Sequence, residues 1–183
     1  MNLTITPEIS LTEFLRPDLD ALVKWLSERG IYERTLRIPH PYTLADAEKW
    51  LTIVGQTASQ NGRVADWAIR DSAGWLIGGV GLECAPANSP HRAEIGYWLA
   101  KPFWGRGIMT AVVATVCRHA FETLGFRKIT AHVFSFNDAS ARVLEKCGFE
   151  PEGYLRQHLQ KDGLLIDIKL YGLLKDSFLA VGL

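Results

Sequence analysis

Residues 101–110 read KPFWGRGIMT and contain a turn followed by the start of a helix. Gly105 and Gly107 form the turn, and a helical pattern of apolar residues begins directly after them. The first turn of a helix has N–H groups without intrahelical partners, and the helix dipole adds partial positive charge there. Glycines let phosphate oxygens approach the backbone, while Arg106 can add a charged contact and Thr110 a hydroxyl. The stretch predicts a phosphate-binding loop.

An ordinary glycine turn leading into a core helix is the other interpretation of the same residues. The patterns GxxxxGK[ST] and GxGxxG are both absent from this stretch, which argues against a nucleoside triphosphatase and a Rossmann dehydrogenase.

The segments on either side of the loop predict a β-α-β unit. Arg92–Ala100 alternates like a strand, with Glu94, Gly96 and Trp98 on one face. The helix that follows Gly105 should end at Gly125, and a strand is expected over Lys128–Phe134. A crossover of this kind makes the two strands parallel and is right-handed.

The remaining pattern predicts a single α/β domain over residues 1–183, with mixed α+β character. The expected order is β-α-α-β-β-β-α-β-α-β-β, a twisted mixed sheet with helices on both faces. The outer elements are a strand over Ile5–Phe14, a helix opening at Pro17–Asp18, a helix from Thr43 to about Asn61, a hairpin of Val64–Arg70 and Trp75–Glu83, a helix over Asp138–Cys147, and strands Phe149–Leu159 and Leu164–Leu174 joined at Asp162–Gly163.

Composition narrows the class of protein. The 20 basic and 20 acidic side chains cancel, so the net charge gives no reason to expect nucleic-acid or membrane-surface binding. Cys84, Cys117 and Cys147 form no CxxC pair and predict reduced, buried thiols. The N-terminus does not read as a signal peptide, and no apolar stretch approaches the length of a bilayer span. We therefore expect a soluble cytoplasmic protein.

Four stretches together resemble the GCN5-related N-acetyltransferase (GNAT) family, and more narrowly its branch of Rim-type (RimJ/RimL-like) ribosomal-protein N-terminal acetyltransferases. They are EIGYWLAKPFWGRGIMTAVV, NDASARVLEKCGF, EGYLRQ and KLYGLLK. The resemblance runs from about Thr6 to about Phe178 and is specific only when the motifs are taken jointly. It implies the GNAT fold and an acyltransferase that uses acetyl-CoA, without a metal.

The family's pyrophosphate motif, Q/R-x-x-G-x-G/A, falls on residues 104–109. Gly107 is kept, whereas Trp104 and Met109 replace the first and last motif residues. Backbone amides bind the pyrophosphate in this motif, so the change to Trp104 should weaken cofactor binding little. Met109 is compatible with the motif if its side chain points into the core. The resemblance implies that coenzyme A contacts the end of one strand, the loop and the last helix, through Trp98, Leu99, Ala100, Gly105, Arg106, Gly107, Ile108, Met109, Thr110, Asn137 and Ser140. The strand end, Trp98 to Ala100, would pair with pantetheine as though with another strand.

Acyl transfer to an amine requires a neutral amine and a proton for the departing thiolate. Glu94 is the candidate base, directly or through water, and a solvated surface glutamate is the alternative. Relatives carry a catalytic glutamate where this chain has Leu159 and a proton-donating tyrosine where it has Leu144. Ser140, or a water it holds, is the candidate replacement donor. Asn137 and Ser140 also fit purely structural roles, as an N-cap and a small packing residue.

The resemblance places the amine acceptor near His40, Tyr42 and Trp50, each of which also fits a loop or core role. The other histidines show no HxxxH or His/Cys pairing, so no metal is expected. The leading hypothesis is direct attack by a primary amine in a ternary complex, and the resemblance favours the α-amine of a protein N-terminus as the acceptor. A polyamine- or aminoglycoside-type acetyltransferase and a non-catalytic acyl-CoA-binding module are the alternatives. A monomer and a homodimer are both compatible with the sequence.

Overall fold

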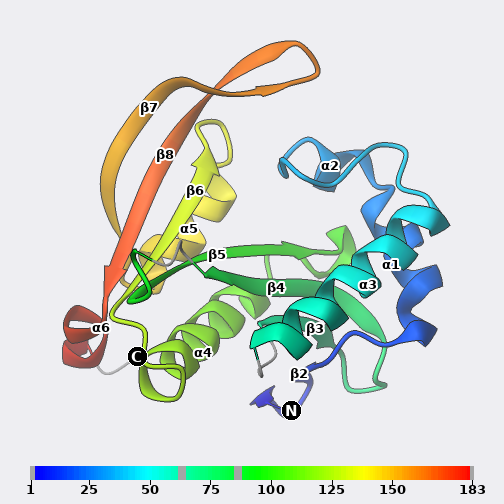
Figure 1. The fold of residues 1–183 in the computed structure, drawn as a ribbon, viewed down its shortest axis with the longest axis horizontal. Coiled ribbons are helices and arrows are strands. Elements are labelled where there is room, and N and C mark those ends of the chain that lie inside the picture. Colours follow the sequence, from blue (N-terminus) through cyan, green and yellow to red (C-terminus); the bar gives the residue numbers. More distant parts are fainter. Residues whose placement is uncertain (1–2, 62–64, 85–87, 182–183) are drawn as a thin grey trace. The chain divides into compact units, whose positions relative to one another are not determined.

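The computed structural model describes residues 3–61, 65–84 and 88–181. The chain divides into two compact units. One comprises Met1–Gly81 and Tyr97–Ile108, and the other comprises Leu82–Gly96 and Met109–Leu183. The eight strands and six α-helices within the described residues make a mixed α/β fold, as the sequence predicts (Figure 1).

The first unit is built on an antiparallel run of strands. In chain order its elements are β1 (Leu3–Thr6), β2 (Ile9–Thr12), α1 (Leu19–Leu26), α2 (Arg29–Tyr32), α3 (Leu44–Asn61), β3 (Asp66–Arg70), β4 (Leu76–Cys84, up to Gly81) and the end of β5 (Arg92–Leu99). Strands β1 to β4 pair in sequence order. Apolar residues of α1 and α3 meet those of β3 and β4 in one buried cluster, which contains Leu22, Leu26, Ala47, Ala68 and Leu76.

The second unit holds the β-α-β crossover and a long hairpin. After the first five residues of β5 come α4 (Ile108–Glu122), β6 (Lys128–Phe134), α5 (Asp138–Lys146), β7 (Glu150–Lys161), β8 (Leu164–Leu174) and α6 (Lys175–Val181). The strand order is β5-β6-β8-β7. Strands β7 and β8 form the long hairpin beside β6 in Figure 1. Strands β5 and β6 are parallel, and their pairing joins Arg92–Glu94 to Lys128–Thr130.

Several element predictions need correction. The N-terminal segment is a two-stranded hairpin rather than one strand, because the chain turns back at Pro7 and Glu8. Helices α2 and α6 were not expected, and both are short. Cys84 is exposed at the end of β4, whereas Cys117 and Cys147 are buried as predicted. Val64, the expected first residue of a strand, lies outside the described residues.

Candidate functional site

The glycine loop contains two residues in the left-handed backbone conformation. Gly105 and Gly107 have φ angles of 73° and 75°, values that favour glycine, and helix α4 begins one residue later at Ile108. The N–H groups of the first turn of α4 therefore follow the loop directly. Arg106 is exposed, and its guanidinium carbon lies 5.5 Å from the ring centroid of Phe103. The predicted loop is a glycine turn at the N-terminus of a 15-residue helix.

Trp104 fastens this loop to the end of β5. Its indole Nε1 donates a hydrogen bond of 2.6 Å to the carbonyl oxygen of Leu99. The guanidinium carbon of Arg34, just after α2, lies 5.6 Å from the Trp104 ring centroid. The family motif predicts no role in cofactor binding for the Trp104 side chain. The available signal was its indole N–H, a donor that needs a partner when the ring is partly buried.

Replacing Trp104 by phenylalanine should weaken acetyl-CoA binding by about 3- to 10-fold, because a typical hydrogen bond contributes about 0.5–1.5 kcal/mol. The aromatic ring stays, and only the contact that positions the loop on the strand is lost. Calorimetric titration of the variant measures the change. Trp75→Phe is the matched control, since Trp75 is 70% exposed in a turn of the same unit. Equal affinities for wild type and Trp104→Phe would show that this hydrogen bond does not support the binding loop.

The end of β5 is held by contacts within the first unit. The Ala100 N–H donates to the Ile77 carbonyl oxygen at 2.8 Å, so it is not available for strand-like pairing with pantetheine. Gly79 permits close approach of Trp98, because a Cβ at that position would lie 2.6 Å from the indole nitrogen. Pairing of pantetheine with Trp98 and Leu99 stays a prediction, and it has to use backbone groups other than the Ala100 amide.

In the second unit, Met109 and Thr110 lie in the first turn of α4, and Met109 belongs to the packed core. Met109 is 8% exposed, which agrees with the prediction that its side chain points inward. The Thr110 carbonyl accepts a hydrogen bond from the Cys147 thiol at 3.4 Å. Burial raises the pKa of Cys147 to about 11 and also raises the pKa of Cys117. These two thiols are poor nucleophiles, because the thiolate is the reactive form.

Asn137 caps helix α5. Its side-chain oxygen accepts a hydrogen bond of 3.3 Å from the Ser140 backbone N–H. The structural role that the sequence offered for Asn137 is confirmed, while contact of Asn137 and Ser140 with the cofactor stays a prediction. Leu144, on the same helix, is fully buried.

Glu94 forms a hydrogen bond that the sequence did not reveal. Its Oε2 lies 2.9 Å from Nδ1 of His132 on the neighbouring strand β6. The hydrogen bond to Glu94 raises the pKa of His132 above its ordinary value, against an opposing effect of burial. The His132 ring is also stacked on that of His158, with centroids 6.3 Å apart and planes 7° from parallel. His132 could have been found only from the parallel register of β5 and β6, which pairs Glu94 with Thr130 and leaves His132 two residues further along the same face.

The predicted acceptor residues have different surroundings. His40 is exposed, and its ring centroid lies 5.0 Å from that of Tyr32. Tyr42 belongs to the buried cluster of the first unit, and burial followed by the charge of Asp46 raises its pKa to about 12. Trp50 packs edge-on against Phe14 with ring centroids 6.3 Å apart. Of the three, the imidazole of His40 is the group most open to a ligand.

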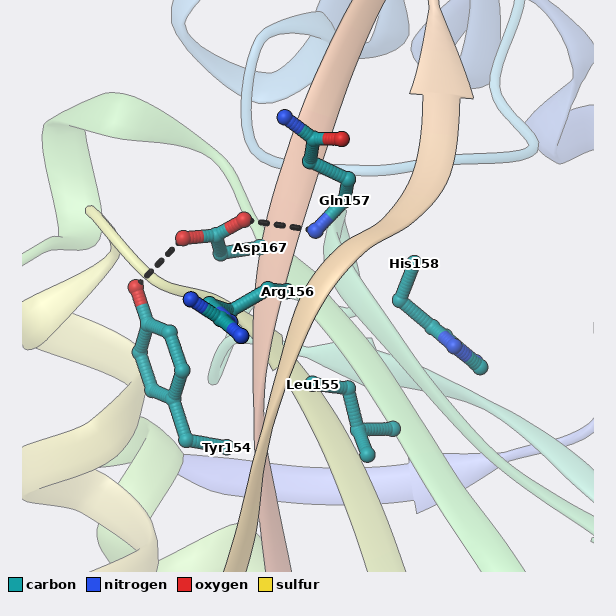
Figure 2. A pocket seen from close by; sticks show the side chains of 6 residues that line it. All are labelled: Tyr154, Leu155, Arg156, Gln157, His158 and Asp167. Carbon is teal, nitrogen blue, oxygen red and sulfur yellow. Dashed lines mark hydrogen bonds between the residues drawn. The ribbon is translucent and has the colours of Figure 1, made fainter.

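A bulge in β7 lines a cavity of about 640 Å³ in the second unit (Figure 2). Residues 156–158 of β7 lie opposite the single residue Asp167 of β8, so β7 carries two extra residues between Leu155 and Leu159. Asp167 fixes the bulge, because its carboxylate accepts from the Gln157 N–H at 2.7 Å and from the Tyr154 hydroxyl at 2.8 Å. These two bonds lower the pKa of Asp167. No pattern in the sequence indicates this bulge.

Among the residues described, no three histidine, cysteine or acidic side chains gather as a metal site would require. None of the helices described is both long and apolar enough to cross a bilayer.

Comparison with known proteins gives concordant matches. The family described as "Acetyltransferase (GNAT) domain" matches residues 9–150. The uncharacterized N-acetyltransferase YoaA of Bacillus subtilis is 38% identical over 63% of this chain and 66% of its own length. The putative ribosomal N-acetyltransferase YdaF of the same organism is 40% identical over 46% of each chain. The matches thus span two thirds or less of these relatives.

The fold is also found in solved structures. A spermidine N-acetyltransferase from Vibrio cholerae, solved with CoA and spermine, superposes with a TM-score of 0.78. The two sequences are 24% identical, and the superposition covers 95% of this chain and 99% of the other. Likeness at this identity establishes a common architecture.

Proposed function

Because the chain belongs to the acetyltransferase (GNAT) domain family, we propose that it transfers an acetyl group from acetyl-CoA to a primary amine. The observation that carries the proposal is the loop of Gly105 and Gly107. Both glycines have positive φ angles, and helix α4 begins at the residue after Gly107. Backbone amides of residues 105–110 would hold the diphosphate of coenzyme A. Arg106 would add a charge-assisted contact to a phosphate oxygen. Trp104 keeps the loop at the end of β5.

Transfer proceeds by direct attack of the amine on the thioester. The thiols of Cys117 and Cys147 are buried and their pKa values are raised, which disfavours them as covalent acyl carriers. Ser140 stands at the start of α5, where its hydroxyl or a water it holds would give a proton to the departing thiolate. The other groups proposed to take part are Glu94, the candidate base, and His40, which would contact the acceptor amine.

The acceptor we propose is the α-amine of a peptide or protein N-terminus. Its ordinary pKa of about 8 leaves part of it neutral at physiological pH, unlike the amines of a polyamine. The acceptor segment 29–42 carries three arginines and one glutamate, and this net positive charge disfavours a polycation. The similarity to YdaF, named as a putative ribosomal N-acetyltransferase, supports the same choice.

Calorimetric titration with acetyl-CoA, followed by a panel of amines with thiol-release detection, tests the proposal. Dephospho-CoA and desulfo-CoA serve as comparison ligands, and the panel contains peptides with free and blocked N-termini, spermidine and an aminoglycoside. Micromolar binding and acetylation of free N-termini, located by mass spectrometry, are expected. If spermidine or the aminoglycoside is turned over faster than the peptides, the acceptor is a small amine and not a peptide N-terminus. Binding without turnover would identify a non-catalytic module, and absence of binding would refute the whole proposal.

A further inference from the structure

Glu94 and His132 meet at the point where two parallel strands stop pairing. The register of β5 and β6 joins Arg92–Glu94 to Lys128–Thr130, and Thr130 is the last residue of β6 in it. Side chains alternate along a strand, so His132 lies on the same face of β6 as Thr130, one pleat further on. From there its imidazole reaches the Glu94 carboxylate at 2.9 Å. The pair therefore links β5 and β6 by a side-chain hydrogen bond where their parallel backbone pairing ends.

The direction of this hydrogen bond sets the chemistry of His132. A carboxylate only accepts, so Nδ1 of His132 carries the hydrogen and donates it to Glu94 Oε2. In the neutral imidazole the other nitrogen, Nε2, then has a lone pair and can take a proton. About a third of each side chain is accessible, 32% for His132 and 36% for Glu94. A carboxylate that orients an imidazole in this way is the arrangement of a general base and its positioning residue.

Building on the proposed function, we infer that His132 Nε2, rather than the Glu94 carboxylate, accepts the proton of the attacking amine. The amine nitrogen attacks the thioester carbonyl carbon, the C–N bond forms, and the N–H proton moves to Nε2. The C–S bond breaks, its electron pair stays on sulfur, and the thiolate takes a proton from Ser140 or water. The His132 imidazolium then returns its proton to solvent, so one proton leaves nitrogen and one joins sulfur.

An imidazole suits this task better than an isolated glutamate. General bases are most effective when their pKa lies near the working pH, and the ordinary values are about 6.5 for histidine and 4.3 for glutamate. The Glu94 hydrogen bond moves the pKa of His132 upward, towards that of an α-amine. Arg92 on β5 opposes this effect, and Lys128 on the same face of β6 is neutralised by Glu152 at 2.6 Å. Glu94 thus acts as a positioning residue.

The bulge of β7 supplies the second support of the His132 ring. Strand β8 separates β6 from β7, yet the rings of His132 and His158 are stacked with centroids 6.3 Å apart. In Figure 2, His158 lies on the side of the hairpin that carries Leu155, away from Tyr154 and Asp167. The φ of 49° at Gln157, held by the Asp167 carboxylate, turns the chain so that His158 points to this side. Asp167 thus holds the bulge that carries His158, and His158 stacks on the His132 ring.

Two conservative variants separate the two candidate bases. His132→Gln removes the titrating group and should lower kcat by about 100-fold or more, with loss of the acidic limb of the kcat–pH profile. Glu94→Gln keeps an acceptor oxygen for the His132 N–H and removes the charge. It should retain a measurable fraction of the activity, with the acidic limb shifted to lower pH, because the negative charge no longer favours the imidazolium. His91→Gln, an exposed histidine outside this cluster, is the control with unchanged activity.

The opposite pattern would overturn the inference. If Glu94→Gln abolishes turnover while His132→Gln keeps the acidic limb and stays within a few-fold of wild type, Glu94 is the base itself. Acetyl-CoA affinity should be unchanged in both variants, which separates a lost base from a lost fold or cofactor site. Lack of turnover by the wild-type enzyme with every amine would refute the proposed function and this assignment together. NMR titration of His132 should show a lower midpoint in Glu94→Gln, and an unmoved midpoint would contradict the coupling.

Discussion

Acetyl-CoA binding is expected to be lost when Gly107 is replaced by glutamate. The φ of 75° at Gly107 is one that other residues adopt at a cost, and its N–H belongs to the loop proposed to hold the diphosphate. Space alone does not forbid a side chain, because a Cβ there would meet no atom within 4 Å. The loss comes from repulsion between the new carboxylate and the diphosphate, since like charges 4 Å apart near a protein surface repel by about 4 kcal/mol.

The affinity should fall by at least about 100-fold, equivalent to about 2.8 kcal/mol, in a calorimetric titration. Gly74→Glu is the matched control. Gly74 has a φ of 81° in a turn of the first unit and also has no atom within 4 Å of an added Cβ. It carries the same backbone penalty and the same charge away from the loop, so its acetyl-CoA affinity should equal that of wild type. Equal weakening in both variants would point to general destabilisation, and tight binding by Gly107→Glu would remove the loop from the cofactor site.

The sequence predicted those parts of the fold that depend on neighbouring residues. Strand β6 has the predicted bounds, Lys128–Phe134, and the hairpin turn falls at Asp162–Gly163 with positive φ at both residues. The helix expected from Thr43 begins at Leu44, and Thr43 and Asp46 cap it reciprocally. Each of these features is determined by hydrophobic period, turn chemistry or a cap within a few residues.

The parts that could not be predicted depend on contacts between distant segments. The hydrogen bond between His132 and Glu94 joins residues 38 positions apart, and the stacking of His132 on His158 requires a bulge whose hydrogen bonds come from another strand. Trp104 was compared with a family motif, which gives the residue type but not the partner of its indole N–H. That residues 1–183 form a single domain stays a prediction.

Loss of the Asp18 carboxylate should destabilise the first unit more than any other single replacement discussed for it. Asp18 and Arg70 form a two-pronged ion pair, with both nitrogen–oxygen distances 2.8 Å, and their side chains are only 7% and 10% exposed. Arg70 also donates to the Thr12 hydroxyl at 2.6 Å, and Asp18 accepts from the Leu15 N–H at 2.7 Å. The pair thereby ties the segment before α1 to strand β3.

Asp18→Ala leaves the Arg70 guanidinium buried without its counter-charge, and removal of one partner from a buried pair costs about 3–5 kcal/mol. The free energy of unfolding measured with urea should fall by that amount. Asp20→Ala, two residues later and exposed on α1, should change it by less than about 0.5 kcal/mol. Joint replacement by apolar residues, Asp18→Leu with Arg70→Met, should recover much of the loss, because no charge then remains buried. A small effect of Asp18→Ala would mean that water or a neighbouring acceptor solvates Arg70, and that the ion pair does not fix α1 to the sheet.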